Sequence, residues 1–351
     1  MAACNTYGAR FGQKVLNIAY SDLTLAPMNS AEHFYLAAHL GFDALKGDVR
    51  ITRDNGLILC HDEGFTLDEN GRIGRYDRNC HTRFLDTDFD DVMKLEYAAF
   101  ADRMGYHAHI CDFDTYVRIC KEEGLRLIVM VNGFSSAIAS VEYPKEHYVN
   151  LYEAYLMTSK KGNQVDASGG KTLEPSYAEV QAFNLEVARE LVTKYDLYGI
   201  QVDYIRYPLP IYYQAHNYED FGYECPASEG FAQQYGADPK TLGINDPLWA
   251  DWCAYRRDVI SGYAKAFYET VKEASPAVEV SFTCFAEYTD RQKYVYQDVE
   301  KWAAEGYADV IYPMIYGNTT EYQLGYAQQI HPVTEDAWVW AITCGQATTP
   351  F

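Results

Sequence analysis

One acidic residue follows an apolar, β-rich run in the middle of the chain. Residues 198–208 read YGIQVDYIRYP, and Asp203 comes where the strand is expected to end. Side chains alternate between the two faces of a strand, so Gln201 and Asp203 share one face. If this face points into a barrel, Asp203 lies at the mouth of a pocket, where a carboxylate can act as a nucleophile or base. The alternative is that Asp203 is only a buried partner of Arg206.

A second carboxyl group is expected on the neighbouring strand. Glycoside cleavage ordinarily uses two carboxyl groups, one that protonates the leaving oxygen and one that acts as nucleophile or base. Glu287 follows the apolar run 278–285, although a solvated loop acid would also fit that position. We expect Asp203 to be the nucleophile or base and Glu287 the general acid, with Asp48 as the rival for either role.

Polar side chains follow other expected strands and could bind a substrate at the same rim. The predicted substrate-binding residues are Tyr20, His61, Asn132, Arg206, Tyr316 and Gln346. The chain also has 32 tyrosines, whose flat apolar faces and hydroxyl groups suit sugars, although many must be packing residues. No cofactor or metal is expected, because the glycine-rich phosphate loops and the CxxC spacing of metal sites are missing from the sequence.

The elements that would position these residues alternate between strands and helices. The expected strands are 15–20, 42–52, 57–62, 125–132, 199–205, 278–285, 308–316 and 337–344. The expected helices are 30–40, with Ser30 as N-cap, 113–123, 177–194, 249–274 and 295–305. Eight strands with interleaved helices predict an α/β fold, a single (β/α)8 barrel over residues 1–351 that lacks its last helix. The long loop excursions 133–175 and 209–247 are expected to shape specificity, and 63–91 crosses one face.

The composition of the chain limits the classes of partner that it is expected to bind. The 351 residues carry a formal charge of −21, which argues against nucleic acid and anionic membranes. No apolar run is long enough to span a bilayer. The nine cysteines, with Cys60, Cys284 and Cys344 in apolar runs, favour a reducing cytoplasm, and a secreted protein whose leader has been removed is the alternative. The sequence leaves the oligomeric state open.

The segment 29–63, NSAEHFYLAAHLGFDALKGDVRITRDNGLILCHDE, combines a helix, an acidic strand and a strand ending in His-Asp. In this pattern the first 130 residues resemble the front half of a glycerophosphodiester phosphodiesterase. Of the family's catalytic positions, this chain keeps Asp48 and the pair His61-Asp62. The family's other catalytic positions fall on Tyr20 and Ser21, on Lys46 and near Met130. A lysine among the ligands would repel a divalent cation, so we expect this chemistry to be lost.

Three later segments carry a second resemblance: 194–208 (KYDLYGIQVDYIRYP), 252–285 and 302–317 (WAAEGYADVIYPMIYG). Residues 177–347 are similar to the glycosyl-hydrolase-like barrels of bacteria. The resemblance implies that the acid of the 199–205 strand, Asp203, is the catalytic carboxylate. Where that family often has an aspartate before the glycine, this chain has Tyr198.

These observations lead to one preferred function and two alternatives. The preferred function is a metal-independent glycoside hydrolase that acts on a carbohydrate in a tyrosine-lined cleft. The first alternative is a phosphodiesterase-like enzyme that uses Asp48 and His61, with a metal. The second is a carbohydrate-binding barrel that has kept its pocket and lost turnover.

Overall fold

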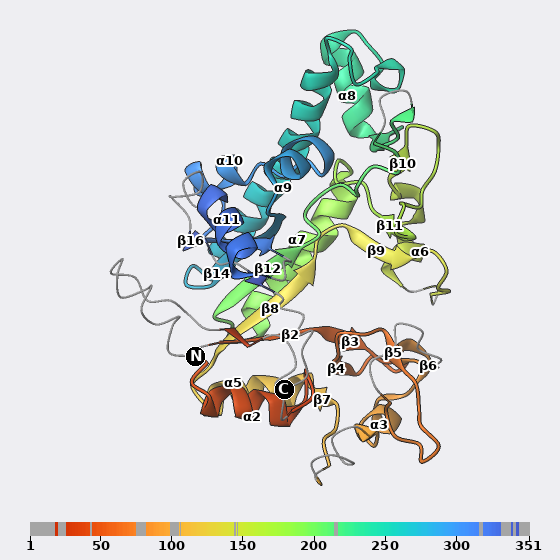
Figure 1. The fold of residues 1–351 in the computed structure, drawn as a ribbon. Coiled ribbons are helices and arrows are strands. Elements are labelled where there is room, and N and C mark those ends of the chain that lie inside the picture. Colours follow the sequence, from red (N-terminus) through yellow and green to blue (C-terminus); the bar gives the residue numbers. More distant parts are fainter. Residues whose placement is uncertain are drawn as a thin grey trace. The chain divides into compact units, whose positions relative to one another are not determined.

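The structure is a computed structural model, and it separates into two compact units (Figure 1). The residues it describes are 18–19, 26–42, 44–74, 82–98, 105, 107–143, 145, 147–213, 217–315, 319–330, 338–339 and 342–343. The first unit comprises Met1–Met130 with Leu197–Gly199, and the second comprises Val131–Asp196 with Ile200–Phe351.

The first unit contains a parallel sheet covered by helices. Strand β1 (Ile18–Ala19) pairs with β2 (Ala44–Gly47), and β2 pairs with β8 (Arg126–Asn132), both in parallel. Helices α2 (Ala31–His39) and α5 (Phe113–Glu122) lie side by side. Their N-caps are Ser30 and Asp112, whose side chains accept the backbone N–H groups of His33 and Thr115. Both helices and the Ser30 cap were predicted from the sequence and are confirmed.

The prediction that residues 57–62 form a barrel strand is wrong. The expected strand 42–52 divides at Asp48 into β2 and β3 (Val49–Ile51), and β3 pairs in antiparallel fashion with β4 (Leu57–Leu59). Strand β4 then pairs with β7 (Cys111–Asp112), again antiparallel. The turn between β3 and β4 is too short for the crossover that a parallel neighbour needs, so β4 folds back as a hairpin.

Residues 63–74 and 82–98 contribute to a small apolar core together with residues of β4 and of the segment before β7. The described elements are β5 (Gly64–Phe65), β6 (Thr82–Arg83), the 3₁₀ turn η1 (Phe84–Asp86) and α3 (Phe89–Val92). Phe65 and Phe84 contact each other, with ring centroids 5.4 Å apart, within a buried cluster that includes Ile58 and Ile110. The polar excursion expected at 63–91 therefore has its own apolar support.

The second unit continues with parallel strands in chain order. Its sheet runs from the end of β8 through β12 (Gly199–Asp203), β14 (Glu279–Phe285) and β15 (Val310–Ile315) to β16 (Trp338–Val339). A further strand, β17 (Ile342–Thr343), also pairs with β15. The strands expected at 199–205, 278–285 and 308–316 are thus found, and the strand expected at 337–344 is described only in two short parts, β16 and β17. Closure of the sheet into a complete eight-stranded barrel stays a prediction.

Helices α7 (Ala178–Lys194) and α9 (Trp249–Ala274) pack against each other in the second unit (Figure 1). The buried side chains of α9 recur at helical spacing: Trp252, Arg256, Ile260, Tyr263, Phe267 and Val271. Helix α10 (Val299–Ala304) begins four residues later than expected, capped by Asp298. Helices α8 (Pro226–Tyr235) and α11 (Thr320–Ile330) were not predicted from the sequence.

The long connections of the second unit form small structures. Residues 133–175 contain β9 (Ser135–Ile138), α6 (Tyr148–Leu151), η2 (Glu153–Tyr155), β10 (Thr158–Ser159) and β11 (Gly170–Thr172). Residues 209–247 contain β13 (Phe221–Tyr223), α8 and η4 (Pro239–Thr241). Pairing of β10 with β13 joins the two excursions, so each supports the other.

A buried ion pair anchors the 209–247 excursion to α9. Arg256 Nη1 lies 2.5 Å from Asp220 Oδ2, and both side chains are fully buried. The hydroxyl groups of Tyr223 and Tyr296 donate to Asp220 over 2.7 and 2.9 Å. The Arg256 guanidinium lies 4.0 Å from the Tyr296 ring centroid and 4.6 Å from that of Trp252. Each charge of the pair is therefore compensated inside the core.

Two of the cysteines that the sequence places in apolar runs are buried in the structure. Cys60 and Cys284 are buried free cysteines, and burial raises the pKa of each thiol to about 12. Both act as small apolar residues, as expected, whereas Cys344 lies outside the described residues. In the part of the chain that the structure describes, no helix has the length and apolar character needed to cross a membrane.

Candidate functional site

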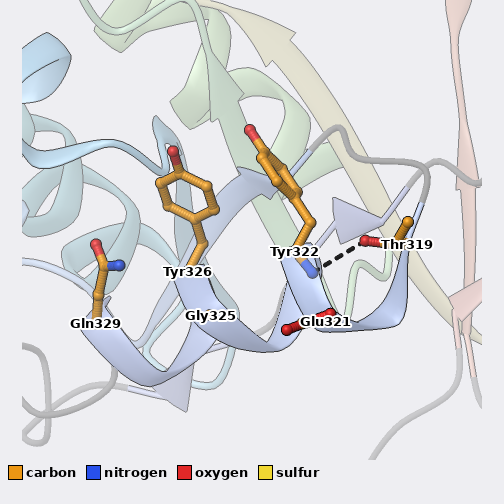
Figure 2. Close-up of a pocket in the computed structure, with 6 residues that line it drawn as sticks. All are labelled: Thr319, Glu321, Tyr322, Gly325, Tyr326 and Gln329. Atoms are coloured by element: carbon orange, nitrogen blue, oxygen red, sulfur yellow. Dashed lines mark hydrogen bonds between the residues drawn. The ribbon is translucent and has the colours of Figure 1, made fainter.

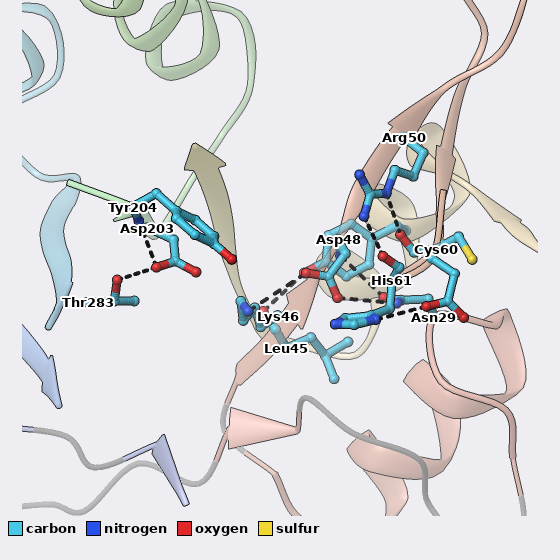
Figure 3. A network of polar contacts seen from close by, with 12 residues as sticks. Asn29, Leu45, Lys46, Asp48, Arg50, Cys60, His61, Asp203, Tyr204 and Thr283 are labelled. Carbon is cyan, nitrogen blue, oxygen red and sulfur yellow. Dashed lines mark hydrogen bonds and ion pairs between the residues drawn. The ribbon is translucent and has the colours of Figure 1, made fainter. Parts of the chain in front are cut away.

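Asp203 ends β12 and is held by two donors (Figure 3). The hydroxyl of Thr283, on the neighbouring strand β14, donates to Asp203 Oδ1 over 2.5 Å, and the backbone N–H of Tyr204 donates over 2.7 Å. Tyr204 has a φ of 52°, in the left-handed region, and this turns the chain out of the strand. Among the described residues, both hydrogen bonds to the half-buried Asp203 carboxylate go to Oδ1.

Arg206 lies among aromatic rings beside the same corner. Its guanidinium carbon is 4.7 Å from the Tyr204 ring centroid and 5.0 Å from that of Phe285, and Nη1 donates to the Tyr207 carbonyl over 3.1 Å. The contacts described for the Asp203 carboxylate come from Thr283 and Tyr204. The expected Arg206–Asp203 ion pair therefore stays a prediction, as does a substrate-binding role for Arg206.

Glu287 lies just beyond the end of β14 and caps the next turn. Its Oε2 accepts the backbone N–H of Asp290 over 2.7 Å, at the start of the π-helical turn η5 (Asp290–Tyr294). Burial, with a smaller contribution from the Glu287 carboxylate, raises the pKa of Asp290. The loop after β14 thus carries two adjacent carboxyl groups, of which sequence analysis selected only Glu287.

Gln297 fixes the ends of both strands and was missed by sequence analysis. Its fully buried side-chain amide donates to the carbonyls of Thr283 and Ile205, over 3.0 and 3.2 Å, and accepts the Phe285 N–H over 3.0 Å. The chain segment after Asp203 and the strand before Glu287 are therefore tied to one side chain. The sequence around Gln297 gives no sign of this role, because the hydrogen-bond partners of Gln297 are distant along the chain.

The structure describes only some of the other residues that were predicted to bind the substrate. Asn132, at the end of β8, is exposed, and the next residue, Gly133, donates its N–H to the Asp203 carbonyl over 2.7 Å. Asn132 therefore directly precedes a residue that is hydrogen-bonded to Asp203. A substrate-binding role for Asn132 stays a prediction. The predicted residues Tyr20, Tyr316 and Gln346 lie outside the described residues.

Asp48 and His61 belong to the first unit, where they lie in a polar cluster (Figure 3). Lys46 Nζ is 3.8 Å from Asp48 Oδ1, and the Asn29 side-chain amide donates to Oδ2 over 3.4 Å. The half-exposed His61 ring contacts Asp62 at 3.3 Å, and this hydrogen bond raises the pKa of His61. Arg50 donates to the carbonyls of Cys60 and His61.

This cluster does not fit a divalent metal. The buried ammonium group of Lys46 already neutralises Asp48, where a metal would need further carboxylate oxygens. No group of three or more His, Cys, Asp or Glu side chains in the described ranges could hold a metal ion. We therefore derive no step of chemistry through a metal at this site.

Glu174 is a buried acid close behind the corner that follows Asp203. The Tyr207 hydroxyl and the Ser176 N–H both donate to Oε1, over 3.0 and 3.2 Å, while Oε2 has no hydrogen-bond partner among the described residues. Burial raises the pKa of this carboxyl group above its ordinary value of 4.5. A neutral carboxyl group suits this position better than an ionised one.

The raised pKa of Glu174 predicts a pH dependence of stability. A carboxyl group whose pKa is higher in the folded chain stabilises the fold below its unfolded pKa, and this contribution is lost as the pH rises through the folded pKa. We expect the free energy of unfolding of the wild type to fall relative to that of Glu174→Gln as the pH rises from about 4.5. Urea unfolding of both proteins at several pH values measures this; a pH-independent difference would contradict it.

Comparison with known proteins places the chain among hydrolases. Residues 131–346 match the family model described as glycosyl hydrolase-like 10, which is more than half of the chain. The chain belongs to this family. Residues 21–201, again more than half, match the glycerophosphoryl diester phosphodiesterase family, so the chain belongs to that family as well. The two resemblances expected from the sequence are confirmed, and the general class of function that both families support is a hydrolase.

The solved structures that match this chain are distant in sequence. A phosphodiesterase from Oleispira antarctica in complex with sn-glycerol-3-phosphate has a TM-score of 0.43 and 12% identity, over 94% of this chain and 85% of that one. α-L-fucosidase isoenzyme 2 from Paenibacillus thiaminolyticus has a TM-score of 0.49 and 14% identity, over 94% and 40%. A search of curated proteins gives no match.

Proposed function

We propose that this protein is a glycoside hydrolase that cleaves a glycosidic bond with two carboxyl groups. Asp203 serves as nucleophile or as base for water, and Glu287 serves as general acid. The proposal rests on the end of the β12–β14 strand pair, where Asp203 presents Oδ2 beside a strand whose following loop carries Glu287. The match to the glycosyl hydrolase-like 10 family supports this choice of chemistry.

We also propose that the whole chain forms one (β/α)8 barrel and that the reaction needs no metal. Metal independence is supported by Lys46, whose ammonium group lies 3.8 Å from Asp48, the acid of the phosphodiesterase pattern that this chain keeps. Asp48 remains the rival for either catalytic role. The candidates for contacts with the substrate are Tyr20, His61, Asn132, Arg206, Tyr316 and Gln346. The phosphodiesterase alternative retains the support of the family match over residues 21–201.

A hydrolysis panel with and without chelator tests the proposal. The wild type is incubated with aryl glycosides, oligosaccharides and glycerophosphodiesters, each in the presence and absence of EDTA. We expect release of sugar at the same rate with and without EDTA, and no phosphodiester cleavage. Phosphodiester cleavage that EDTA abolishes would establish the phosphodiesterase instead. Saturable glycan binding without any product would establish a carbohydrate-binding barrel that has lost turnover.

A further inference from the structure

A tyrosine-lined hollow lies along one side of α11 (Figure 2). Its volume is about 440 Å³, and it is lined by Thr319, Glu321, Tyr322, Gly325, Tyr326 and Gln329. The side chains of Tyr322, Tyr326 and Gln329 project from the same side of the helix, as their spacing requires. The two rings lie 4.9 Å apart at 55°, and Tyr322 is 46% exposed. Gly325 adds no side chain to this lining.

One tyrosine of the hollow interacts electrostatically with two carboxyl groups that follow β14. The hydrogen bond with Tyr322 and burial raise the pKa of Tyr326, and the carboxylates of Glu287 and Asp290 add smaller contributions. Burial raises the pKa of Tyr213, and Asp290 adds to that effect. The Tyr213 ring meets Tyr294 edge to face at 5.1 Å. Tyr326 and Tyr213, which come from separate segments, therefore both interact with the Asp290 carboxyl group.

We propose that the α11 hollow is a sugar-binding subsite, in which Tyr322 and Tyr326 pack against one pyranose ring. The C–H face of a pyranose is apolar and fits an aromatic ring, while its hydroxyl groups need donors and acceptors at the edge. The tyrosine hydroxyls and the Gln329 amide supply both kinds of group. This inference rests on the proposed function, in which the general acid is Glu287, a carboxyl group that interacts electrostatically with Tyr326.

The charges around the hollow specify the class of sugar. Glu321 lines the hollow itself, and the carboxylates of Glu287 and Asp290 interact electrostatically with Tyr326. Of the cations in the η5 turn, Arg291 is buried in an ion pair with Glu300, and Lys293 is exposed to solvent. The excess negative charge around the hollow repels a ligand that is itself an anion. The subsite therefore accepts an uncharged sugar or one with a free amine, and rejects uronic acids and other acidic sugars.

Calorimetric binding with defined oligosaccharides tests this subsite. The probes are cello-, malto- and xylo-oligosaccharides, chitosan oligomers and oligogalacturonates. The variants are Tyr322→Ala and Tyr326→Ala, the ring-preserving Tyr322→Phe and Tyr326→Phe, and Leu324→Ala as a control, since Leu324 is 44% exposed on the same helix. We expect a neutral or amino-bearing probe to bind, the alanine variants to weaken it about tenfold, and the phenylalanine variants and the control to keep most of the affinity.

The outcomes separate this inference from the proposed function. Binding that the alanine variants weaken, without hydrolysis of any probe, would support the subsite and overturn the glycoside hydrolase. Hydrolysis with unchanged affinity in the alanine variants would overturn the subsite alone. The strongest binding by oligogalacturonates, or no binding by any probe, would also overturn it. Loss of binding in Leu324→Ala equal to that in the alanine variants would overturn it as well, because the effect would then not come from the rings.

Discussion

Replacing Asp203 by asparagine is expected to lower kcat by at least ~100-fold on any glycoside that the wild type hydrolyses, with a much smaller change in KM. The asparagine can still accept hydrogen bonds from Thr283 and the Tyr204 N–H through its amide oxygen. What it lacks is the negative charge and basicity of Oδ2, so the loss falls on the chemical step. Steady-state kinetics of Asp203→Asn against the wild type measure the effect.

Asp196→Asn is the matched control, because Asp196 is an exposed aspartate shortly before the same strand. We expect it to keep wild-type kcat and KM. Circular dichroism and thermal unfolding of both variants confirm that the fold is intact. If Asp203→Asn retains more than about a tenth of wild-type kcat, Asp203 is not the catalytic carboxylate, and its role is structural.

Replacing Asp220 by asparagine is expected to lower the free energy of unfolding by about 3–5 kcal/mol. The substitution keeps the size of the side chain but leaves Arg256 as an uncompensated cation with no exposure to solvent. Removing one partner of a buried ion pair costs far more than the pair itself contributes. Urea unfolding followed by tryptophan fluorescence measures the change, since Trp252 packs on the Arg256 guanidinium.

The exposed pair Arg189–Glu273 provides the comparison. Because both side chains are largely in solvent, Glu273→Gln is expected to change the free energy of unfolding by less than about 1 kcal/mol. Equal effects of Asp220→Asn and Glu273→Gln would show that the buried network around Arg256 is not a major source of stability.

Much of the second unit could be predicted from the sequence because its signals are local. The periodic apolar side chains of α9 and the apolar runs of β12, β14 and β15 identify these elements without knowledge of the fold. In the first unit, the same reasoning failed at β4. Its apolar run resembles a barrel strand, and only the short turn before it reveals a hairpin.

The candidate site was predicted less completely because its contacts are nonlocal. Asp203 stands out, since an acid after a strand is visible in the sequence. Gln297 and Thr283 do not, because their relation to Asp203 exists only once β12 and β14 are neighbours. The α11 tyrosines were missed for another reason: weak amphipathicity left the helix itself unpredicted.

The close backbone contacts of Gly133 restrict which residues relatives of this chain can have at this position. A Cβ atom at this position would lie 3.0 Å from the Tyr204 carbonyl oxygen and 3.1 Å from that of Asp203, and both are backbone atoms that cannot rotate away. The missing side chain is what allows the two loops to meet at the Asp203 corner. During divergence, position 133 is thus expected to accept a larger residue only together with a rearranged corner. In an alignment of relatives, glycine there would mark the sequences that keep this backbone path.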